Sequence, residues 1–580
     1  MKEDQLFKAR HSLSHLMTMA VLELYPDAGL GVGPVIENGF YQDYDLPESV
    51  SDDILKQLEK RIRHLIKQNI EFAQHEVDFD TALSEYKNDP YKTELIEELK
   101  EKGESAVSFY KSGDFENLCK GPHVASTKEI DPKAFKLTKI AGAYWRGDEK
   151  RQMLTRIYGV AFDTKEELDA YLKMIEEAKK RDHRKLGKEL GLFRFSDLVG
   201  KGLPLFTPKG ATVRRILEQF IVNEEIRRGY LHVVTPDIAK LDLYKKSGHY
   251  PHYKDSMYAP IVIDDEEYML RPMTCPHHYE LFLSEPHSYR DLPMRIAELA
   301  KLYRYEQSGE LSGLMRVRSF CLADAHIICA DEEQAVDEVG KALDLIEFVA
   351  EKFGLKMGEN YSYRLSLGDR EDQEKYYKND AAWDKSEDLL REMLQKRGGE
   401  FVEEEGEAAF YGPKIDIQMR NVLGKEDTAF TVQYDFCGPD RFELDYTAAD
   451  GTKKRSVVIH RSSIGAIERI MAFLIEHYAG AFPLWLAPVQ AVFASVGESH
   501  VAYVEKLVQD LKDVGVRAEA DVSSDTIGSK VRKAAKQKVP WTVVVGDKEM
   551  DGGDFQINVF GEDDTLVLSK DDLVKLALEK

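Results

Sequence analysis

Hydrophobic and polar positions along the chain predict several folded regions of different types. In residues 1–161, turn-rich segments surround an opening amphipathic helix and a second helical stretch at about 52–68. The closing segment, KLTKIAGAYWRGDEKRQMLTRIYGVAF, alternates apolar and polar residues in a way that predicts strand, turn, strand. This first region is therefore expected to be an α+β domain.

A connecting helix is predicted next, over residues 162–190. The segment DTKEELDAYLKMIEEAKKRDHRKLGKELGLF begins with two cap candidates, Asp163 and Thr164, and continues with helix formers and no proline. From 191 to 482, amphipathic runs such as ATVRRILEQFIVNEEIRRGY are interspersed with β-rich runs such as FTVQYDF and KRSVVIH, which predicts the largest domain. Strands alternate with helices over residues 483–580, which indicates a small α/β domain with a mainly parallel sheet.

Composition agrees with a multidomain protein of α+β and α/β parts, because 580 residues are too many for one hydrophobic core. The formal charge of −24 argues against a general basic surface for nucleic acid. Two local basic segments, 179–188 and 530–538, are either solvated helix faces or contacts for an RNA. The chain has neither an apolar run of membrane-spanning length nor a secretory leader, and its five cysteines are few and odd in number, so we expect a cytoplasmic protein.

One segment carries the most specific chemistry. Residues 304–320, RYEQSGELSGLMRVRSF, resemble motif 2 of the class II aminoacyl-tRNA synthetases. The blocks GHYPHYKDSMY, LRPMTCPHH, ADAHIIC and AFYGPKID are similar to those of the threonyl-tRNA synthetases in particular, and the resemblance runs in order through the whole chain. It implies an editing domain over 1–161, a class II catalytic domain with an antiparallel sheet over 191–482, and an anticodon-binding domain over 483–580. The amino-terminal ubiquitin-like domain of many bacterial members has no counterpart in this sequence.

The resemblance implies a ligase that activates threonine with ATP and Mg²⁺, transfers it to tRNA(Thr), and hydrolyses mischarged seryl-tRNA(Thr). Negative charge accumulates when the threonine carboxylate meets the α-phosphate, so the reaction needs cations already in place. By resemblance, Arg304 contacts both groups and Arg316 meets the distal phosphates. The adenine would be held by Glu306, Phe320 and, in HRSSIGAIER, Arg469.

Further positions in the catalytic domain match functional positions of the family. His249 and Met273 fall in the catalytic pocket, with His249 assisting transfer to the tRNA ribose. Pro236 corresponds to the proline of motif 1, which forms the dimer interface in the family, so a homodimer is implied.

A metal site is implied by three residues that lie far apart along the chain: Cys275, His326 and His460. A thiolate and two imidazoles suit zinc with one position left open, although residues this far apart in sequence are, by themselves, more typical of a buried core than of a metal site. The resemblance places all three on the family's zinc ligands, one ion per subunit. The pocket for threonine would be bordered by Asp324, Tyr411 and Gln433. Leu322 and Ala323 depart from the family pattern just before Asp324.

The amino-terminal domain contains the predicted editing residues. HSLSH places His11 and His15 one helical turn apart, and CKGPH places Cys119 four residues before His123. By resemblance these four, with Lys92, hydrolyse seryl-tRNA; a tetrahedral zinc site or simple packing are the alternative interpretations. Asn117 and Gln42 differ from the family pattern.

In the last domain, Glu549 matches an anticodon-contacting position, whereas Asn558 stands where arginine is frequent. Two other hypotheses remain for the whole chain: an inactive paralogue that only captures RNA, and a class II synthetase for another amino acid. ATP–pyrophosphate exchange across the amino acids distinguishes all three.

Overall fold

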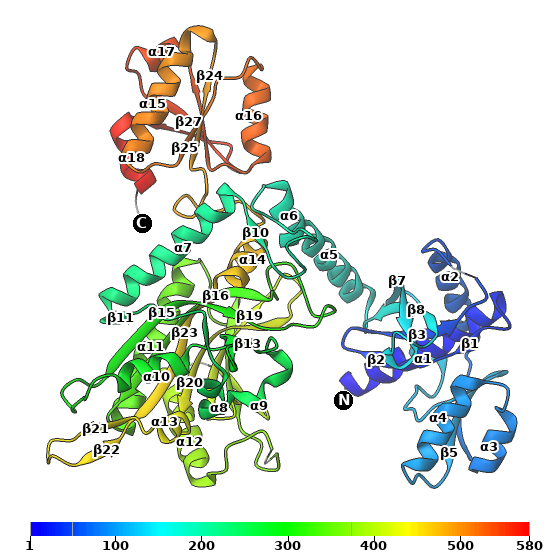
Figure 1. The fold of residues 1–580 in the computed structure, drawn as a ribbon. Coiled ribbons are helices and arrows are strands. Elements are labelled where there is room, and N and C mark those ends of the chain that lie inside the picture. The colour runs from blue at the N-terminus through cyan, green and yellow to red at the C-terminus, as the bar shows by residue number, and fades with distance from the viewer. Residues whose placement is uncertain (1, 49, 373, 399, 579–580) are drawn as a thin grey trace. The chain divides into compact units, whose positions relative to one another are not determined.

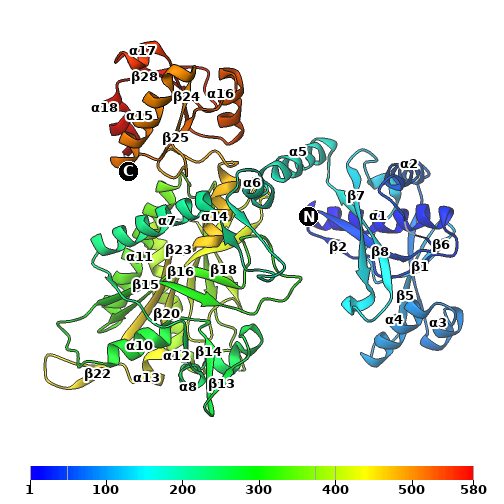
Figure 2. The ribbon, with the colours of Figure 1, turned by 45° about the horizontal axis from the view of Figure 1, so that its top comes forward.

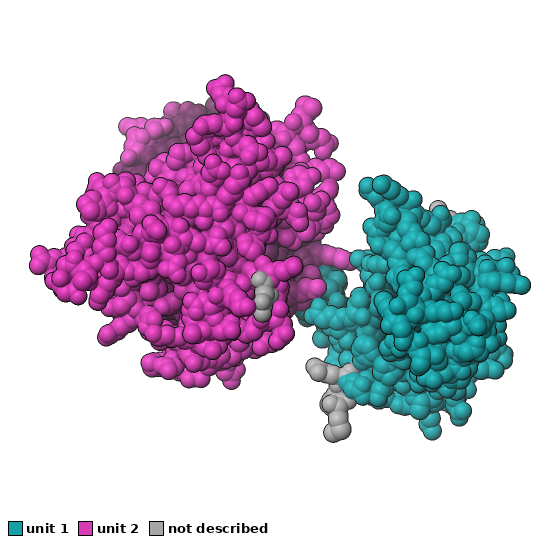
Figure 3. All heavy atoms as spheres, turned by 60° about the horizontal axis from the view of Figure 1, so that its bottom comes forward, with its two compact units in different colours: residues 1–176 teal, residues 177–580 magenta. Residues whose placement is uncertain are grey.

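The computed structural model describes residues 2–48, 50–372, 374–398 and 400–578. The chain divides into two compact units, residues 1–176 and 177–580 (Figure 3). Within the described ranges, no helix combines the length and apolar character needed to cross a membrane. The division between the units falls inside helix α5 (Lys165–Arg181).

In the first unit, two helices pack on an antiparallel sheet (Figure 1). The helices are α1 (Lys2–Leu24) and α2 (Ile54–Ile66), and α2 confirms the helix predicted at 52–68. The sheet is ordered β1 (Gly29–Leu30), β3 (Gly39–Asp45), β8 (Met153–Ala161), β7 (Phe135–Tyr144), with β2 (Val35–Ile36) paired to β3. Strands β7 and β8 are the predicted strand, turn, strand.

A second layer of this unit contains a three-stranded sheet with two helices. Its strands are β4 (Phe72–Val77), β5 (Val107–Ser112) and β6 (Phe115–Leu118), and its helices are α3 (Phe79–Glu85) and α4 (Pro90–Glu101). Helix α4 begins with Pro90 at its first turn, after Asp89, whose carboxylate accepts from the backbone N–H groups of Tyr91 and Lys92. This cap fixes the first turn of α4, which carries Lys92.

The predicted connecting helix is in fact two helices. Helix α5 ends at Arg181, and α6 (His183–Glu189) begins two residues later. Asp182 separates them, with its side chain accepting from the backbone N–H of Arg184. Aspartate is more favourable as an N-cap than inside a helix, which explains a break that helix formers alone do not predict.

The second unit is built on an eight-stranded sheet. In order, its strands are β11 (Leu231–His232), β15 (Met294–Tyr303), β16 (Ser319–Cys329), β23 (Val457–Ala466), β20 (Glu426–Asp435), β19 (Lys414–Arg420), β17 (Tyr361–Leu367) and β18 (Phe401–Glu405). The inner pairs are antiparallel and the outermost pair at each end is parallel. The antiparallel sheet expected over residues 191–482 is confirmed.

The two faces of this sheet carry different helices. One face packs against α7 (Pro208–Arg227), α11 (Glu332–Lys352), α12 (Asp380–Arg397) and α14 (Ile467–His477) in the main core. The other face meets α10 (Cys275–Leu283) and α13 (Gly438–Phe442). Smaller elements complete the region: β9 (Phe193–Arg194), β10 (Leu205–Phe206), β12 (Ile238–Lys240), α8 (Leu241–Ser247), α9 (His249–His252), β13 (Ile261–Ile263), β14 (Glu266–Leu270), β21 (Asp445–Thr447) and β22 (Lys453–Arg455).

The last part of the chain forms a five-stranded α/β sheet (Figure 2). Its order is β25 (Ala518–Asp521), β24 (Ala491–Ser495), β26 (Trp541–Val545), β27 (Phe555–Val559), β28 (Thr565–Leu568). Helices α15 (Val501–Asp513) and α18 (Lys570–Leu578) pack on one face and α16 (Ile527–Lys536) on the other. Strands β25, β24 and β26 are parallel as predicted, but β27 and β28 are antiparallel. The connection from β26 to β27 contains only the short helix α17 (Asp547–Met550), too short for a parallel crossover.

Candidate functional sites

A hairpin between β15 and β16 gathers charged residues over the eight-stranded sheet. The Arg304 guanidinium lies 5.2 Å from the ring centroid of Phe320. In the loop, Arg316 donates to Glu306 at 2.9 Å. Arg469, from α14, donates to the carbonyl oxygens of Met315 at 3.1 Å and of Thr428 at 2.9 Å. The five residues predicted to hold ATP therefore come together.

These side chains form a pocket suited to an anion. Its volume is about 260 Å³, and Met273 lies in its wall with its sulfur 3.5 Å from an Arg304 nitrogen. Burial lowers the pKa of Arg304, and burial together with the Arg304 charge lowers that of Arg469. Burial therefore penalises both charges, and the Arg304 charge also repels Arg469. A phosphate group would relieve that repulsion.

The three predicted metal ligands meet at the floor of this pocket. His326 on β16 and His460 on β23 are direct cross-strand partners, with ring centroids 4.5 Å apart. Cys275 is the first residue of α10, on the same face of the sheet. The ligand atoms of all three lie within 4.8 Å of one another.

Hydrogen bonds to neighbouring residues decide which nitrogen of each ligand imidazole keeps a lone pair for a metal. The Asp435 carboxylate accepts from His460 Nε2 at 2.8 Å, which leaves His460 Nδ1 unprotonated. The Glu298 carboxylate likewise accepts from His278 Nε2 at 3.3 Å, so His278 Nδ1 is unprotonated and accepts from His326 Nδ1 at 2.8 Å. His326 Nε2 then keeps its lone pair. Histidine ligands of zinc characteristically donate their other nitrogen to such partners, so the residues present fit the ion.

The side chains predicted to select threonine border the same floor. Asp324 lines the pocket, and its carboxylate lies 4.0 Å from His326 Nε2. The Tyr411 ring stacks on His460 at 4.9 Å, and its hydroxyl donates to Gln433. His249 is not in the pocket wall but lies behind it, with Nε2 3.6 Å from Cys275 Sγ.

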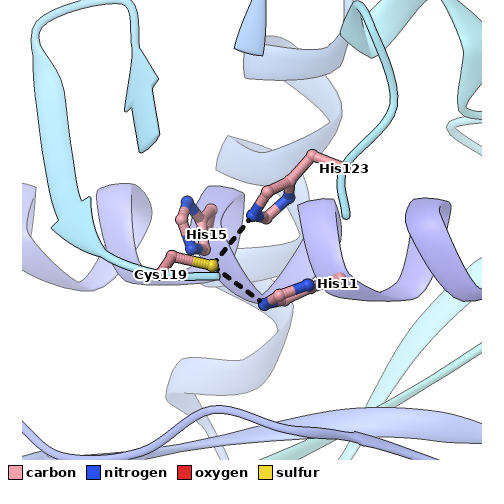
Figure 4. A group of neighbouring side chains, drawn as sticks. All are labelled: His11, His15, Cys119 and His123. Atoms are coloured by element: carbon pink, nitrogen blue, oxygen red, sulfur yellow. Dashed lines mark hydrogen bonds between the residues drawn. The ribbon is translucent and has the colours of Figure 1, made fainter. Parts of the chain in front are cut away.

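A second cluster lies in the first unit (Figure 4). His11 and His15 project from α1, Cys119 follows β6, and His123 comes from the next loop. The Cys119 sulfur lies 3.3 Å from His11 Nε2 and 3.2 Å from His123 Nε2. The spacing of His11 and His15 predicts a shared helix face, and the structure brings all four residues together.

Hydrogen bonds also assign tautomers here. The Pro122 carbonyl can only accept, so His11 Nδ1 carries the proton and Nε2 has a lone pair. Ser12 donates its hydroxyl proton to the Lys8 carbonyl and so accepts from His123 Nδ1 at 3.0 Å. Two imidazole lone pairs therefore face one thiol, which has a single proton to donate.

Burial sets the charge of this site. It lowers the pKa of His15 to about 3 and raises that of Cys119 to about 11, so these groups are neutral near pH 7. It also lowers the pKa of Lys92 to about 8. Lys92 lines a pocket of about 410 Å³ together with Gln42 and Asn117. Among the described residues, Asn117 Oδ1 is buried with no hydrogen-bond partner and can accept from a ligand.

The predicted anticodon residues lie apart in the last domain. Glu549 is mostly buried, and its carboxylate accepts from the Gly546 backbone N–H at 2.9 Å. Asn558 is exposed on β27 and donates weakly to the Thr542 carbonyl at 3.4 Å. In the basic segment 530–538, Lys530 is buried and donates to the Ser495 carbonyl, so this lysine is structural.

Sequence reasoning missed the groups that support the metal ligands. The Asp435 carboxylate bonds His460, and His278 bonds His326. Glu298 in turn bonds His278. Only the paired histidines of CPHH give any indication in the sequence, since Asp435 and Glu298 are placed by strand register.

Comparisons with known proteins match each part of the chain. A family described as the tRNA synthetase class II core domain (G, H, P, S and T) matches residues 258–478, and an anticodon-binding domain family matches 490–580. Residues 107–158 match the threonyl and alanyl tRNA synthetase second additional domain.

Whole-chain relatives agree. A threonine–tRNA ligase of Geobacillus sp. (strain WCH70) is 50% identical over 97% of this chain and 87% of its own length. That of Gloeobacter violaceus is 47% identical over 100% of this chain and 92% of its own. A crystal structure of the RNA binding domain of threonyl-tRNA synthetase from Cryptosporidium parvum Iowa II superposes with a TM-score of 0.65 at 35% identity, covering 68% of this chain and 97% of that one.

Proposed function

The chain belongs to the threonyl-tRNA synthetases, the ATP-dependent threonine–tRNA ligases, and from this premise we propose how its own residues divide the work. The pocket over the antiparallel sheet activates threonine, and the cluster on α1 removes serine that has been attached in error. The convergence of Cys275, His326 and His460 beside an arginine-lined pocket is the observation that carries this proposal.

For activation, we assign the anion pocket to ATP with its Mg²⁺. Arg304 faces the α-phosphate and the threonine carboxylate, and Arg316 exchanges its bond with Glu306 for the distal phosphates. Phe320 and Arg469 would sandwich the adenine. Because Arg304 is buried and already fixed, it neutralises the charge that develops at the α-phosphate without reorganising, which is usually the largest source of catalysis in such sites.

For selection, we assign Cys275, His326 and His460 to one zinc ion per subunit. Held by these three residues, zinc would supply Lewis acidity toward the amino group and the hydroxyl of threonine. Asp324 accepts from the same hydroxyl, and its pKa, raised by burial, reflects how costly an unpaired carboxylate is there. Valine has no hydroxyl and leaves Asp324 unmatched, so it is rejected strongly.

Serine keeps the hydroxyl and lacks only a methyl group, which a pocket distinguishes by roughly 10–200-fold. The first unit supplies the second check. Neutral His11, His15 and His123 can accept a proton from water, and Lys92 can hold the ester or the 3′ end of the tRNA.

One observation favours a second candidate for that cluster. Two imidazole lone pairs converge on the Cys119 sulfur, which a single thiol proton cannot satisfy, so the four residues also suit a metal ion. Metal analysis separates the two candidates, because editing by the protein groups alone predicts about one zinc per chain and a metal here predicts about two.

The activation proposal is tested with Cys275→Ala. This variant should lose its zinc and its threonine-dependent ATP–pyrophosphate exchange while remaining folded, because two imidazoles alone hold zinc poorly. Cys329→Ala is the matched control, since Cys329 is equally buried but lies in the main core. Full zinc and full exchange in Cys275→Ala would remove the assignment.

The editing proposal is tested with the double variant His11→Ala, His15→Ala. Threonylation should remain close to wild type while seryl-tRNA accumulates, because the two residues lie in the first unit. His64→Ala, an exposed histidine on α2, is the control. Undiminished hydrolysis of seryl-tRNA in the double variant would assign the cluster to another task.

We also propose that the enzyme is a cytoplasmic homodimer. Apolar side chains are exposed from the end of α7 to β12, including Val234, which is 95% exposed beside Pro236. A second subunit would cover these apolar side chains, which supports an interface here.

A further inference from the structure

The basic segment 179–188 contains a histidine that the functions above do not use. His183 is the first residue of α6 and is only 3% exposed, so it is not part of a solvated basic face. Its ring lies between two catalytic elements, the hairpin loop of residues 304–318 and helix α14. The segment therefore docks onto the catalytic domain through this side chain.

Both nitrogens of the His183 ring are engaged. Glu476 of α14 accepts from Nδ1 at 2.7 Å and from the His183 backbone N–H at 3.3 Å. A carboxylate only accepts, so Nδ1 carries the ring proton and Nε2 has a lone pair. That lone pair accepts from the Leu314 backbone N–H at 3.1 Å. Although Asp182, His183 and Glu476 could together hold a metal, the lone pair of the histidine is already occupied.

The bonded amide lies in the part of the loop that borders the ATP pocket. Leu314 is fully buried, so its N–H has no water to bond if His183 is lost. The next residue, Met315, is held from the other side by Arg469 through its carbonyl. Arg316, assigned above to the distal phosphates, follows directly.

The turn is also shaped to receive the ring. Gly313 has φ of +50°, a conformation that favours glycine. A Cβ at Gly313 would overlap His183 Nε2, so only glycine lets the imidazole approach this closely. The backbone conformation of Gly313, the space left by its missing side chain and the hydrogen bond from Leu314 all place the His183 ring against this turn.

We propose that His183 is a positioning residue for ATP: by bonding Leu314 N–H while anchored to Glu476, it holds the hairpin loop so that Arg316 and Glu306 meet the nucleotide. It acts through the loop and does not touch the substrate. This inference rests on the proposed ATP site.

Replacing His183 by asparagine or by glutamine tests the two hydrogen bonds of the ring one at a time. His183→Asn places its amide near Nδ1 and keeps Glu476, whereas His183→Gln reaches the position of Nε2 and keeps an acceptor for Leu314. In ATP–pyrophosphate exchange with threonine, His183→Asn should raise the KM for ATP roughly tenfold, equivalent to about 1.4 kcal/mol. His183→Gln should stay within about threefold of wild type, and in both variants the KM for threonine should change by less than about twofold.

A matched control exists in the last domain. His500 also accepts from a backbone amide, Gly497 N–H at 3.2 Å, and pairs with a carboxylate, Asp547 at 2.9 Å. His500→Asn should leave the KM for ATP unchanged. Gly313→Ala provides an independent variant: it should raise the KM for ATP in the wild type, and by less in a His183→Ala background, where the obstructing ring is gone.

Equal ATP KM values in the Asn and Gln variants, or parallel increases for ATP and threonine, would overturn the proposal and leave His183 a merely structural residue. Failure of the proposed function is distinguishable, since the wild type would then show no exchange with threonine at all.

Discussion

The buried charge of Lys92 is predicted to lower the stability of the first unit against unfolding. It is 2% exposed, and burial lowers the pKa of its ammonium from 10.5 to about 8. Below pH 8 the folded and unfolded states both hold the proton, and the full cost of burying the charge is present. Between pH 8 and 10.5 only the unfolded state holds it, so the stability of the fold rises with pH across this window. At 1.36 kcal/mol per pKa unit, the cost near pH 7 is about 3 kcal/mol.

Lys92→Met keeps an unbranched apolar stem and removes the charge. At pH 7 it should therefore stabilise residues 2–176 by up to about 3 kcal/mol, and at pH 9 by about 1.4 kcal/mol less, because the wild-type lysine is by then mostly neutral. The same variant should lose seryl-tRNA hydrolysis. Stability that is gained while activity is lost is the expected behaviour of a charge buried for function.

The assay is a urea series on the full chain with pulse-labelling hydrogen exchange and mass spectrometry, read on peptides from α1 and α4. Lys136→Met is the control, because Lys136 is exposed on β7 and its replacement should change the unfolding free energy by no more than about 0.5 kcal/mol. If Lys92→Met destabilises these peptides at pH 7, or if its effect is the same at pH 7 and pH 9, the reasoning from burial is wrong.

Three further predictions concern other parts of the chain. Asp435→Asn should weaken zinc binding about 10–100-fold in competition with a chelator, because it disturbs the bond that orients His460; unchanged affinity would contradict the assigned tautomer. Asn558→Arg should tighten tRNA binding and steepen the dependence of threonylation on the anticodon, since it adds charge and reach on an exposed strand; no change would place recognition elsewhere. Val234→Asp should shift the mass in light scattering from dimer toward monomer, because it buries a charge at the proposed interface; a dimer that persists would refute that interface.

Local patterns predicted the elements whose causes are local. The alternation in residues 136–162 gave β7 and β8, and the i, i+4 spacing placed His11 and His15 on one helix face. The break at Asp182 was missed because helix propensity outweighed a capping residue in the sequence pattern.

The catalytic site depends on contacts that no spacing reveals. His326 and His460 meet only because β16 pairs with β23 in one register, and a bulge between Leu322 and Asp324 sets that register. A shift of one strand by one residue would turn its imidazole away from the other one and toward the main core. The resemblance to a known family indicated these ligands, whereas Asp435 and His183 are recognised only from their contacts.

The most direct measurement is ATP–pyrophosphate exchange by the zinc-loaded wild type with threonine, serine and valine. The account predicts efficient exchange with threonine, exchange with serine lower in kcat/KM by roughly 10–200-fold, and exchange with valine lower by about four orders of magnitude or more, because only valine leaves Asp324 and the metal without a hydroxyl. Exchange with valine within about tenfold of threonine, or none with threonine, would contradict the assignment of this pocket.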